Sequence, residues 1–243
     1  MLRFDRLEIA MEGGILRADM NLAAGRRVAV VGPSGAGKST LLDAVAGFRE
    51  IVSGNLLWGD QNLTAKDPAQ RPISILFQDG NLFPHLSVAR NLALALRPDG
   101  GRLDHTQREA MTTALERVGL SGFDLRMPAT LSGGQRSRVA LARVLLQARP
   151  VLMLDEPFAA LGPAMKDDML ALVEDLAEEI GALVVLVTHD PADARSFAQD
   201  IVLVADGLVH EPVPVRNFFS SPPEAYRAYV GKQGFRVFEN GPI

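Results

Sequence analysis

Residues 32–39 spell GPSGAGKS, a run of glycines and small residues that ends in a lysine and a serine. This spacing is typical of a phosphate-binding loop, because glycines let backbone N–H groups turn inward onto phosphate oxygens. The loop follows the apolar run 27–31 and opens a helical pattern, so bound phosphates meet a helix N-terminus. We expect Lys38 to reach the β- and γ-phosphates, Ser39 to ligate magnesium and Thr40 to add a hydrogen bond. The preceding loop residues of the predicted site are Gly32, Pro33, Ser34, Gly35, Ala36 and Gly37.

A second group of residues able to take part in catalysis lies near the end of VLMLDEP, residues 151–157. An apolar strand that ends in two carboxylates places them at the strand-end edge where α/β sheets bind ligands. We expect Asp155 to hold magnesium, directly or through water, and Glu156 to polarise the attacking water. The alternative is a helix-capping aspartate followed by a surface glutamate.

Two further predicted strands end in polar side chains that converge on the same edge. Gln78 follows ISILF, and His189 lies two residues beyond ALVVLV. The Gln78 amide can contact magnesium or the attacking water, and His189 can donate a hydrogen bond to the γ-phosphate. For the histidine, the alternative is a cap or a satisfied surface group.

A second anion site is predicted at TLSGGQRSRVALAR, residues 130–143. Ser132 is a good helix N-cap, and Gly133 and Gly134 leave room for an anion near the helix dipole. This site offers no catalytic side chain, and a well-capped structural helix is the alternative. Because the loop at 32–40 already serves one nucleotide, we expect this helix start to cap the γ-phosphate of a nucleotide on another chain, in a head-to-tail dimer.

The elements that position these residues follow from the hydrophobic pattern. Unalternated apolar runs predict buried strands of a largely parallel sheet, and helical periodicity follows most of them. This pattern predicts an α/β fold with a mostly parallel core sheet, as in P-loop nucleoside triphosphatases. The predicted core strands are 27–31, 73–77, 151–155, 182–187 and 201–205, and the helices include 38–48 and 166–180.

Two regions depart from the parallel core. Segments 2–22 and 51–58 alternate loosely around the turn signals Gly13-Gly14 and Ser53-Gly54, which predicts an N-terminal antiparallel β subdomain. Between Gln78 and Pro150 we identify no strand, and three helical patterns predict an inserted helical subdomain. These patterns lie near 87–96, 104–118 and 133–147. The expected organisation is one domain over 1–243, with core 1–77 and 150–210, helical subdomain about 78–149 and tail 211–243, where 221–230 is a candidate last helix.

Composition restricts the function classes. The 243 residues carry a formal net charge of −4 and no cysteine, which disfavours nucleic-acid binding and excludes disulfides and thiolate metal sites. The N-terminus lacks the apolar stretch of a signal peptide, and the apolar runs are too short to span a bilayer. We therefore expect a soluble chain whose membrane role, if it has one, comes through a partner.

Taken together, GPSGAGKST, ILFQ, LSGGQ, VLMLDEP and VTHD resemble the ATP-binding cassette (ABC) family in order and spacing over nearly the whole chain. The resemblance implies binding and hydrolysis of ATP with Mg²⁺ by a homodimer. It also implies integral membrane permease subunits, indirectly a solute-binding protein, no nucleic acid, and a peripheral location on the cytoplasmic side of the membrane. The implied signature, used by the partner chain, is Leu131, Ser132, Gly133, Gly134 and Gln135.

Within this family the sequence of residues 70–94 and the compact ending look most similar to the ATP-binding subunits of thiamine importers. Iron, polyamine and molybdate importers share much of that wording and stay open as alternatives. The family also implies that residues after Gln78 dock on the membrane subunits. The candidates for docking are Leu82, Phe83, Pro84 and Leu86, which could instead belong to the core of the helical subdomain.

Two positions depart from the family pattern. The aromatic residue that stacks on adenine is replaced, by spacing, with Met11, whose thioether stacks less specifically. The aspartate usual after DEPFAAL is Gly162, followed by Pro163 as a natural first helical residue. A non-hydrolysing nucleotide-binding module and a soluble ATPase acting on ribosomes or DNA ends are the rival functions. The presence of Lys38, Asp155, Glu156 and His189 argues against the first, and a single cassette without sustained heptads argues against the second.

Overall fold

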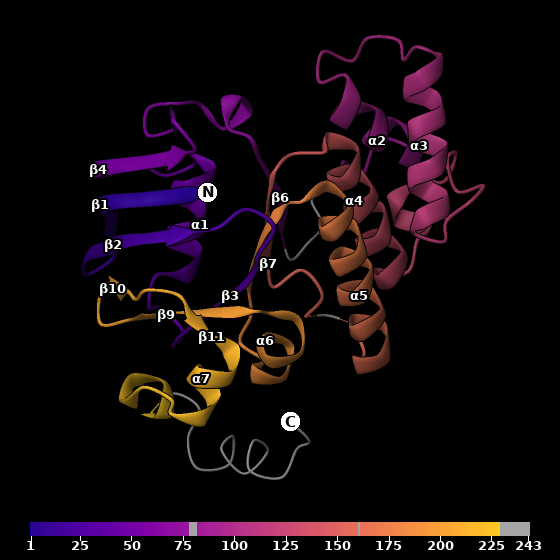
Figure 1. The fold of residues 1–243 in the computed structure, drawn as a ribbon. Coiled ribbons are helices and arrows are strands. Elements are labelled where there is room, and N and C mark those ends of the chain that lie inside the picture. Colours follow the sequence, from indigo (N-terminus) through magenta and orange to yellow (C-terminus); the bar gives the residue numbers. More distant parts are fainter. Residues whose placement is uncertain (78–81, 160, 229–243) are drawn as a thin grey trace. The chain divides into compact units, whose positions relative to one another are not determined.

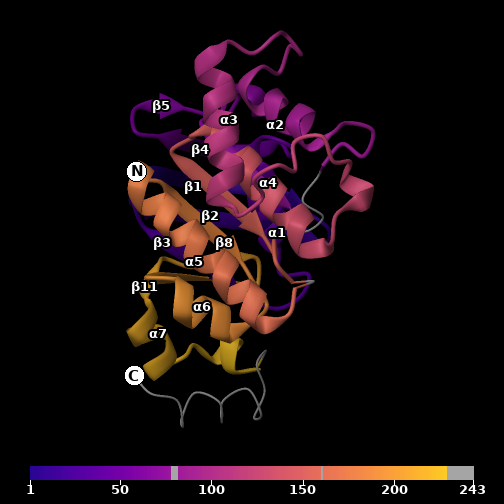
Figure 2. The same ribbon diagram turned by 90° about the vertical axis from the view of Figure 1, so that its right-hand side faces the viewer.

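The structure is a computed structural model that describes residues 1–77, 82–159 and 161–228. The chain divides into two compact units, described separately below. The first comprises Met1–Arg71 and Leu183–Ile243, and the second comprises Pro72–Ala182. Figures 1 and 2 show the elements from two directions.

The first unit begins with antiparallel strands, as the N-terminal alternation predicts. Strand β1 pairs with β2 on one side and β4 on the other, and β5 extends the sheet beyond β4. Side chains on β2 alternate between buried and exposed, as expected for a sheet with one face on the core. The bounds are β1 Leu2–Met11, β2 Gly14–Leu22, β4 Ile51–Trp58 and β5 Gln61–Asn62.

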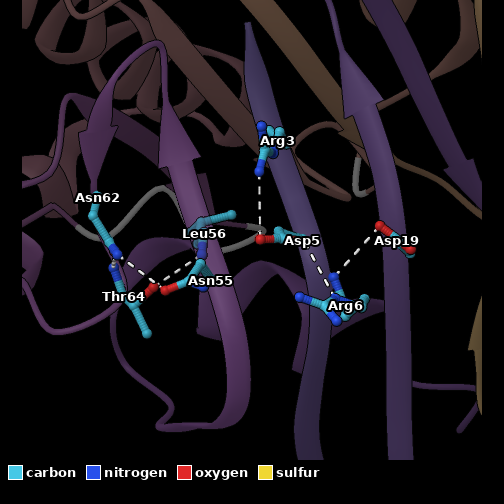
Figure 3. Close-up of polar contacts among 8 residues, drawn as sticks. All are labelled: Arg3, Asp5, Arg6, Asp19, Asn55, Leu56, Asn62 and Thr64. Carbon is cyan, nitrogen blue, oxygen red and sulfur yellow. Dashed lines mark hydrogen bonds and ion pairs between the residues drawn. The ribbon is translucent and has the colours of Figure 1, made fainter.

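A bulge interrupts β1 at Arg6 (Figure 3). Arg6 has a φ of 47°, and its backbone N–H donates to the Asp19 carboxylate at 3.4 Å. On the other side, Gly54 of β4 has a φ of 82°, and a methyl carbon added to it would overlap the Arg6 carbonyl oxygen. The prediction of a turn at Ser53-Gly54 is therefore wrong. Both residues lie within β4, where the glycine accommodates the bulge of its neighbour.

In the parallel part of the first unit, β3 lies between β8 and β9 and pairs with both. Short β10 pairs in parallel with β2 and antiparallel with β9, which connects the two groups of strands, and β11 pairs with β9. The bounds are β3 Arg27–Val31, β8 Leu183–Val187, β9 Asp200–Ala205, β10 Leu208–Val209 and β11 Val213–Pro214. The helices are α1 Lys38–Ala46, η1 Pro68–Gln70, α6 Pro191–Phe197 and α7 Val215–Ser220.

In the second unit, three helices are inserted between two parallel strands. β6 pairs with β7, and α2, α3 and α4 lie between them in the chain. These helices share a core of buried residues that includes Val88, Leu92, Leu115, Val118, Leu131 and Val139. The bounds are β6 Ile73–Phe77, α2 Val88–Leu96, α3 His105–Arg117, η2 Pro128–Thr130, α4 Gly133–Gln147, β7 Val151–Asp155 and α5 Pro163–Ile180.

All five predicted core strands and the three predicted inserted helices are confirmed, whereas the short helices α6 and α7 were not predicted. Residues 224–228 are helical, and the rest of the predicted last helix, 229–230, lies outside the described residues. The predicted subdomain boundaries stay a prediction. Among the described residues, no helix is long and apolar enough to cross a membrane.

Candidate nucleotide-binding site

The predicted phosphate-binding loop connects β3 to α1 in the first unit. Gly37 is the N-cap of α1 with a φ of 107°. A glycine has no side chain to accept from the first-turn N–H groups, so these groups are left for a bound anion. The Lys38 ammonium donates to the carbonyl oxygens of Gly32 at 2.8 Å and Pro33 at 2.9 Å, which holds the side chain across the loop. The Ser39 side chain next to it is exposed at the helix start.

Gly32 is fixed by strand packing. It follows β3 with a φ of 151°, and a methyl carbon added to it would overlap the carbonyl oxygen of Val204. Val204 belongs to β9, the parallel neighbour of β3, where Val31 lies opposite Leu203. The first glycine of the loop is therefore required for close approach to β9 as well as for loop geometry.

Met11, the predicted contact to the nucleotide base, lies beside the N-cap of α1. It is the last residue of β1, where it pairs with Gly14, and it is half-buried. A methyl carbon added to Gly37 would lie 3.4 Å from the Met11 sulfur. Arg49, after α1, donates to the carbonyl oxygen of Ala10 at 3.0 Å and so ties the end of β1 to this region. The thioether thus lies next to the phosphate-binding loop.

His189 reaches the same strand-end edge as the loop. In the parallel pair β3–β8, Val30 lies opposite Val187. Gly32 and His189 each come two residues later, so the register places them at the same level. Neighbouring bonds fix this turn, because Asp190 N–H donates to Thr188 Oγ1 at 3.0 Å and Thr188 donates to the carboxylate of Asp193 at 3.1 Å. The His189 side chain is exposed.

The two predicted catalytic carboxylates lie at the end of β7 in the second unit. Asp155 is opposite Phe77 of β6, and both carboxylate residues are half-buried. Glu156 has a φ of 45°, an uncommon conformation for a residue with a side chain, and it turns the chain sharply away from the strand. Ala159 N–H donates to the Glu156 carbonyl oxygen at 3.3 Å, which closes the turn.

Gln78 lies outside the described residues, directly after β6. The predicted docking segment resumes at Leu82, which packs on the helical core, whereas Phe83 is 44% exposed. Asn91 of α2 holds this segment in place. Its buried amide accepts from Phe83 N–H at 2.7 Å and donates to the carbonyl oxygens of Phe83, at 3.1 Å, and Leu86, at 3.0 Å. The chain therefore presents Phe83 to solvent from a fixed loop.

The second predicted anion site opens α4. Ser132 is its N-cap and accepts from Gln135 N–H at 3.2 Å, while Gln135 accepts from Ser132 N–H at 3.0 Å. This reciprocal capping box confirms the predicted cap and gives Gln135 a structural partner. Leu131 is buried in the helical core, and Ser132 and Gly133 are exposed. The helix start is thus rigidly attached and open to solvent at its tip.

The predicted site residues are divided between the two units. The first unit brings together the phosphate-binding loop, Met11 and His189, and the second holds Asp155, Glu156 and the start of α4. Among the described residues, no group of three or more acidic, histidine or cysteine side chains forms a ready metal site. Two supporting residues were not predicted: Asn91, and Arg71, which is buried and donates to the carbonyl oxygens of Ala44 and Val45 at the end of α1. A single polar residue beside an apolar segment gives no sign of its burial.

Comparison with known proteins gives consistent matches. The ABC transporter family model matches residues 15–159. The thiamine import ATP-binding protein ThiQ of Cereibacter sphaeroides is 54% identical over 231 residues, which cover 95% of this chain and 100% of the relative. Proteins of the same name from Ruegeria sp. and Vibrio cholerae are 49% and 47% identical, over 95% and 86% of this chain and 100% and 87% of theirs.

Solved structures match over nearly the same length. The dimeric structure of MJ0796, a bacterial ABC transporter cassette, has a TM-score of 0.76 at 29% identity, covering 89% of this chain and 99% of that one. A post-hydrolysis dimer of the same cassette bound to ADP and Pi has a TM-score of 0.75 at 30% identity, with coverage of 89% and 99%. The ADP conformation of the cassette MJ1267 matches in fold, with a TM-score of 0.84 at 22% identity over 96% and 99%. These matches confirm the predicted fold class.

Proposed function

This chain belongs to the ABC transporter family, and we propose that it is the ATP-hydrolysing subunit of an importer for thiamine. The observation that carries the thiamine assignment is the similarity, over nearly its whole length, to relatives named thiamine import ATP-binding protein. The local geometry supports the ATPase part of the proposal, since a strand, a glycine loop and a helix start form a phosphate site with Lys38 lying across it.

In this proposal the first unit binds the nucleotide. The N–H groups at the start of α1 hold the phosphates, and the Lys38 ammonium exchanges its carbonyl partners for phosphate oxygens. Thr40 adds a hydrogen bond, and Met11 packs on the base beside Gly37. The nucleotide is ATP because the family binds ATP.

Mg²⁺ is expected with the nucleotide, because the side chains predicted to hold it carry oxygen donors. An exposed hydroxyl at Ser39 and the Asp155 carboxylate, together with the Gln78 amide oxygen, suit this hard cation, which takes further oxygens from phosphates and water. When bound, the cation neutralises charge on the β- and γ-phosphate oxygens. These side chains would hold it and so orient the nucleotide.

Hydrolysis requires a base and a γ-phosphate contact. Glu156 would accept a proton from the water whose oxygen attacks the γ-phosphorus, while the bond to the bridging β–γ oxygen breaks and ADP leaves. His189 would donate a hydrogen bond to the γ-phosphate from the level of Gly32. Gln78 would contact the attacking water or the cation.

The start of α4 would complete the site of a second copy. Its signature, Leu131 to Gln135, presents N–H groups at an exposed, capped helix start, yet carries no group able to hydrolyse ATP itself. A head-to-tail homodimer with two composite sites gives this helix start a role. Dimeric structures are known for the similar cassette MJ0796.

Coupling to transport requires integral membrane permease subunits and, through them, a solute-binding protein. We assign Phe83 to the permease contact and Leu82 to the helical core, because Phe83 is exposed on the segment held by Asn91, as is Pro84, whereas Leu82 packs on the helical core. The chain would then lie on the cytoplasmic face of the membrane as a peripheral subunit, without a role in nucleic-acid binding.

The test is solute-dependent ATPase activity of the reconstituted importer. The chain, its permease and the binding protein are placed in proteoliposomes with thiamine, ferric iron, putrescine or molybdate. We expect thiamine alone to raise the ATPase rate several-fold. Stimulation by another solute would overturn the thiamine assignment, and an absence of hydrolysis under every condition would overturn the ATPase assignment.

A further inference from the structure

The two adjacent glycines at the start of α4 have different surroundings. At Gly133, which is exposed, a methyl carbon would meet no heavy atom within 4 Å in the described part of the chain. At Gly134, which is buried, a methyl carbon would overlap the sulfur of Met165 and lie 3.2 Å from its Cε. Both glycines are helical positions without a positive φ, so neither is required by backbone conformation. The space beside Gly134 is therefore filled from within the same chain.

Met165 comes from α5, which directly follows the loop after Glu156. It is the third residue of this helix, after Pro163, and Gly162 is the N-cap. Two hydrogen bonds stiffen the connection: Ala159 N–H donates to the Glu156 carbonyl oxygen, and Leu161 N–H donates to the Phe158 carbonyl oxygen at 3.0 Å. The Met165 thioether thus connects the end of the loop after Glu156 to the start of α4.

We propose that Met165 is a positioning residue for the signature helix and that Gly134 is glycine to accommodate it. This inference rests on the proposed function and refines it. The capping box between Ser132 and Gln135 fixes the first turn of α4, and the Met165 contact fixes where that turn lies on α5. At Gly133 the corresponding position stays open to solvent. The two adjacent glycines therefore differ in what a side chain at each position would meet.

A merely structural role makes a different prediction. Met165 is 40% exposed, so shortening it removes little buried surface and should lower the melting temperature by no more than about 3 °C. Its flexible side chain can also move aside when Gly134 gains a methyl group. If the contact only packs two helices, changes at either residue should leave dimer formation unaffected.

The experiment is a double-mutant cycle on the full chain in a Glu156→Gln background. Gly134→Ala, Met165→Ala and the double variant are compared for ATP-dependent dimerisation by sedimentation, for ATP affinity of the monomer and for melting temperature. We expect Gly134→Ala to weaken dimerisation about tenfold and Met165→Ala about threefold, with ATP affinity unchanged. In the Met165→Ala background, the Gly134→Ala penalty should fall below about twofold, because the new methyl group then occupies vacated space.

Two controls separate this role from a contact with phosphate. Gly133→Ala should weaken ATP-dependent dimerisation by the same factor with Met or Ala at position 165. Met165→Leu should dimerise nearly as well as the chain with native Met165. An equal Gly134→Ala penalty in both backgrounds, or undiminished dimerisation of Met165→Ala, would overturn the inference. If the Glu156→Gln chain with native Gly134 and Met165 forms no ATP-dependent dimer, the proposed function fails instead.

Discussion

Replacing Arg71 with methionine should destabilise the first unit strongly, although this residue touches no predicted ligand. Arg71 is 3% exposed and lies at the C-terminal end of α1, the helix that begins at the phosphate-binding loop. Its guanidinium donates to the carbonyl oxygens of Ala44 at 2.7 Å and Val45 at 2.8 Å in the last turn. It also donates to the carbonyl oxygens of Lys66 at 2.9 Å and Thr64 at 3.2 Å, in the loop after β5. Burial lowers the pKa of this guanidinium, which still stays charged at neutral pH.

The loss in free energy of unfolding expected for Arg71→Met follows from these hydrogen bonds. A hydrogen bond to a charged group contributes about 1.5–3 kcal/mol, and a buried carbonyl left without a donor costs about 1–3 kcal/mol. The Ala44 oxygen keeps Gly47 N–H as a donor, and the loss of a buried charge returns part of the cost. We therefore expect Arg71→Met to lower the free energy of unfolding by about 4 kcal/mol. Arg71→Lys keeps one or two of the bonds and should cost about 2 kcal/mol.

Urea denaturation followed by the fluorescence of Trp58, the single tryptophan, reports on the first unit. With a slope of about 3 kcal/mol per molar urea, Arg71→Met should lower the midpoint by about 1.3 M. Arg17→Met is the matched control, because Arg17 is exposed and pairs only at the surface with Glu8, and it should leave the midpoint unchanged. A midpoint for Arg71→Met equal to that of the control would refute this account of α1.

Three shorter predictions test other features. Gly32→Ala should abolish ATP binding, measured by calorimetry, because the methyl group overlaps the Val204 carbonyl oxygen; unaltered affinity would contradict the packing argument. Phe83→Asp should stay folded by circular dichroism and lose copurification with the permease, whereas retained association would argue against docking there. The hydrogen bond from Arg97 lowers the pKa of Asp99 to about 2, so the Asp99 carboxylate should stay ionised down to about that pH. Its contribution to the stability of the loop after α2 should be complete above about pH 4 and should be lost as the pH falls toward 2. In Arg97→Gln an NMR titration should show the Asp99 pKa moving up toward its ordinary value, and an unmoved pKa would exclude this cause.

Much of the local structure is predictable because each signal is contained in a few neighbouring residues. The phosphate-binding loop follows from its glycines between β3 and α1, and the strands from runs such as 183–187, which is buried throughout. The capped start of α4 follows from Ser132. Each of these patterns depends on local backbone chemistry or on burial over a whole segment.

Other features depend on contacts between distant residues, which no local pattern records. Gly54 resembles a turn residue, yet it lies inside a strand because Arg6, far away in sequence, bulges toward it. Helix α6 has seven residues, too few for a hydrophobic period to stand out. Met165 gives no sign of its contact with Gly134, since one apolar residue at a helix start fits many environments.

The measurement that tests the composite site most directly is ATP hydrolysis by mixed dimers. Lys38→Ala disables the phosphate-binding loop, and Ser132→Arg disables the signature that the partner uses, so each variant alone should be inactive. An equimolar mixture forms mixed dimers with one intact site each, which should restore up to about a quarter of the wild-type rate. A mixture as inactive as its two components would contradict the proposal that each site is built from two chains.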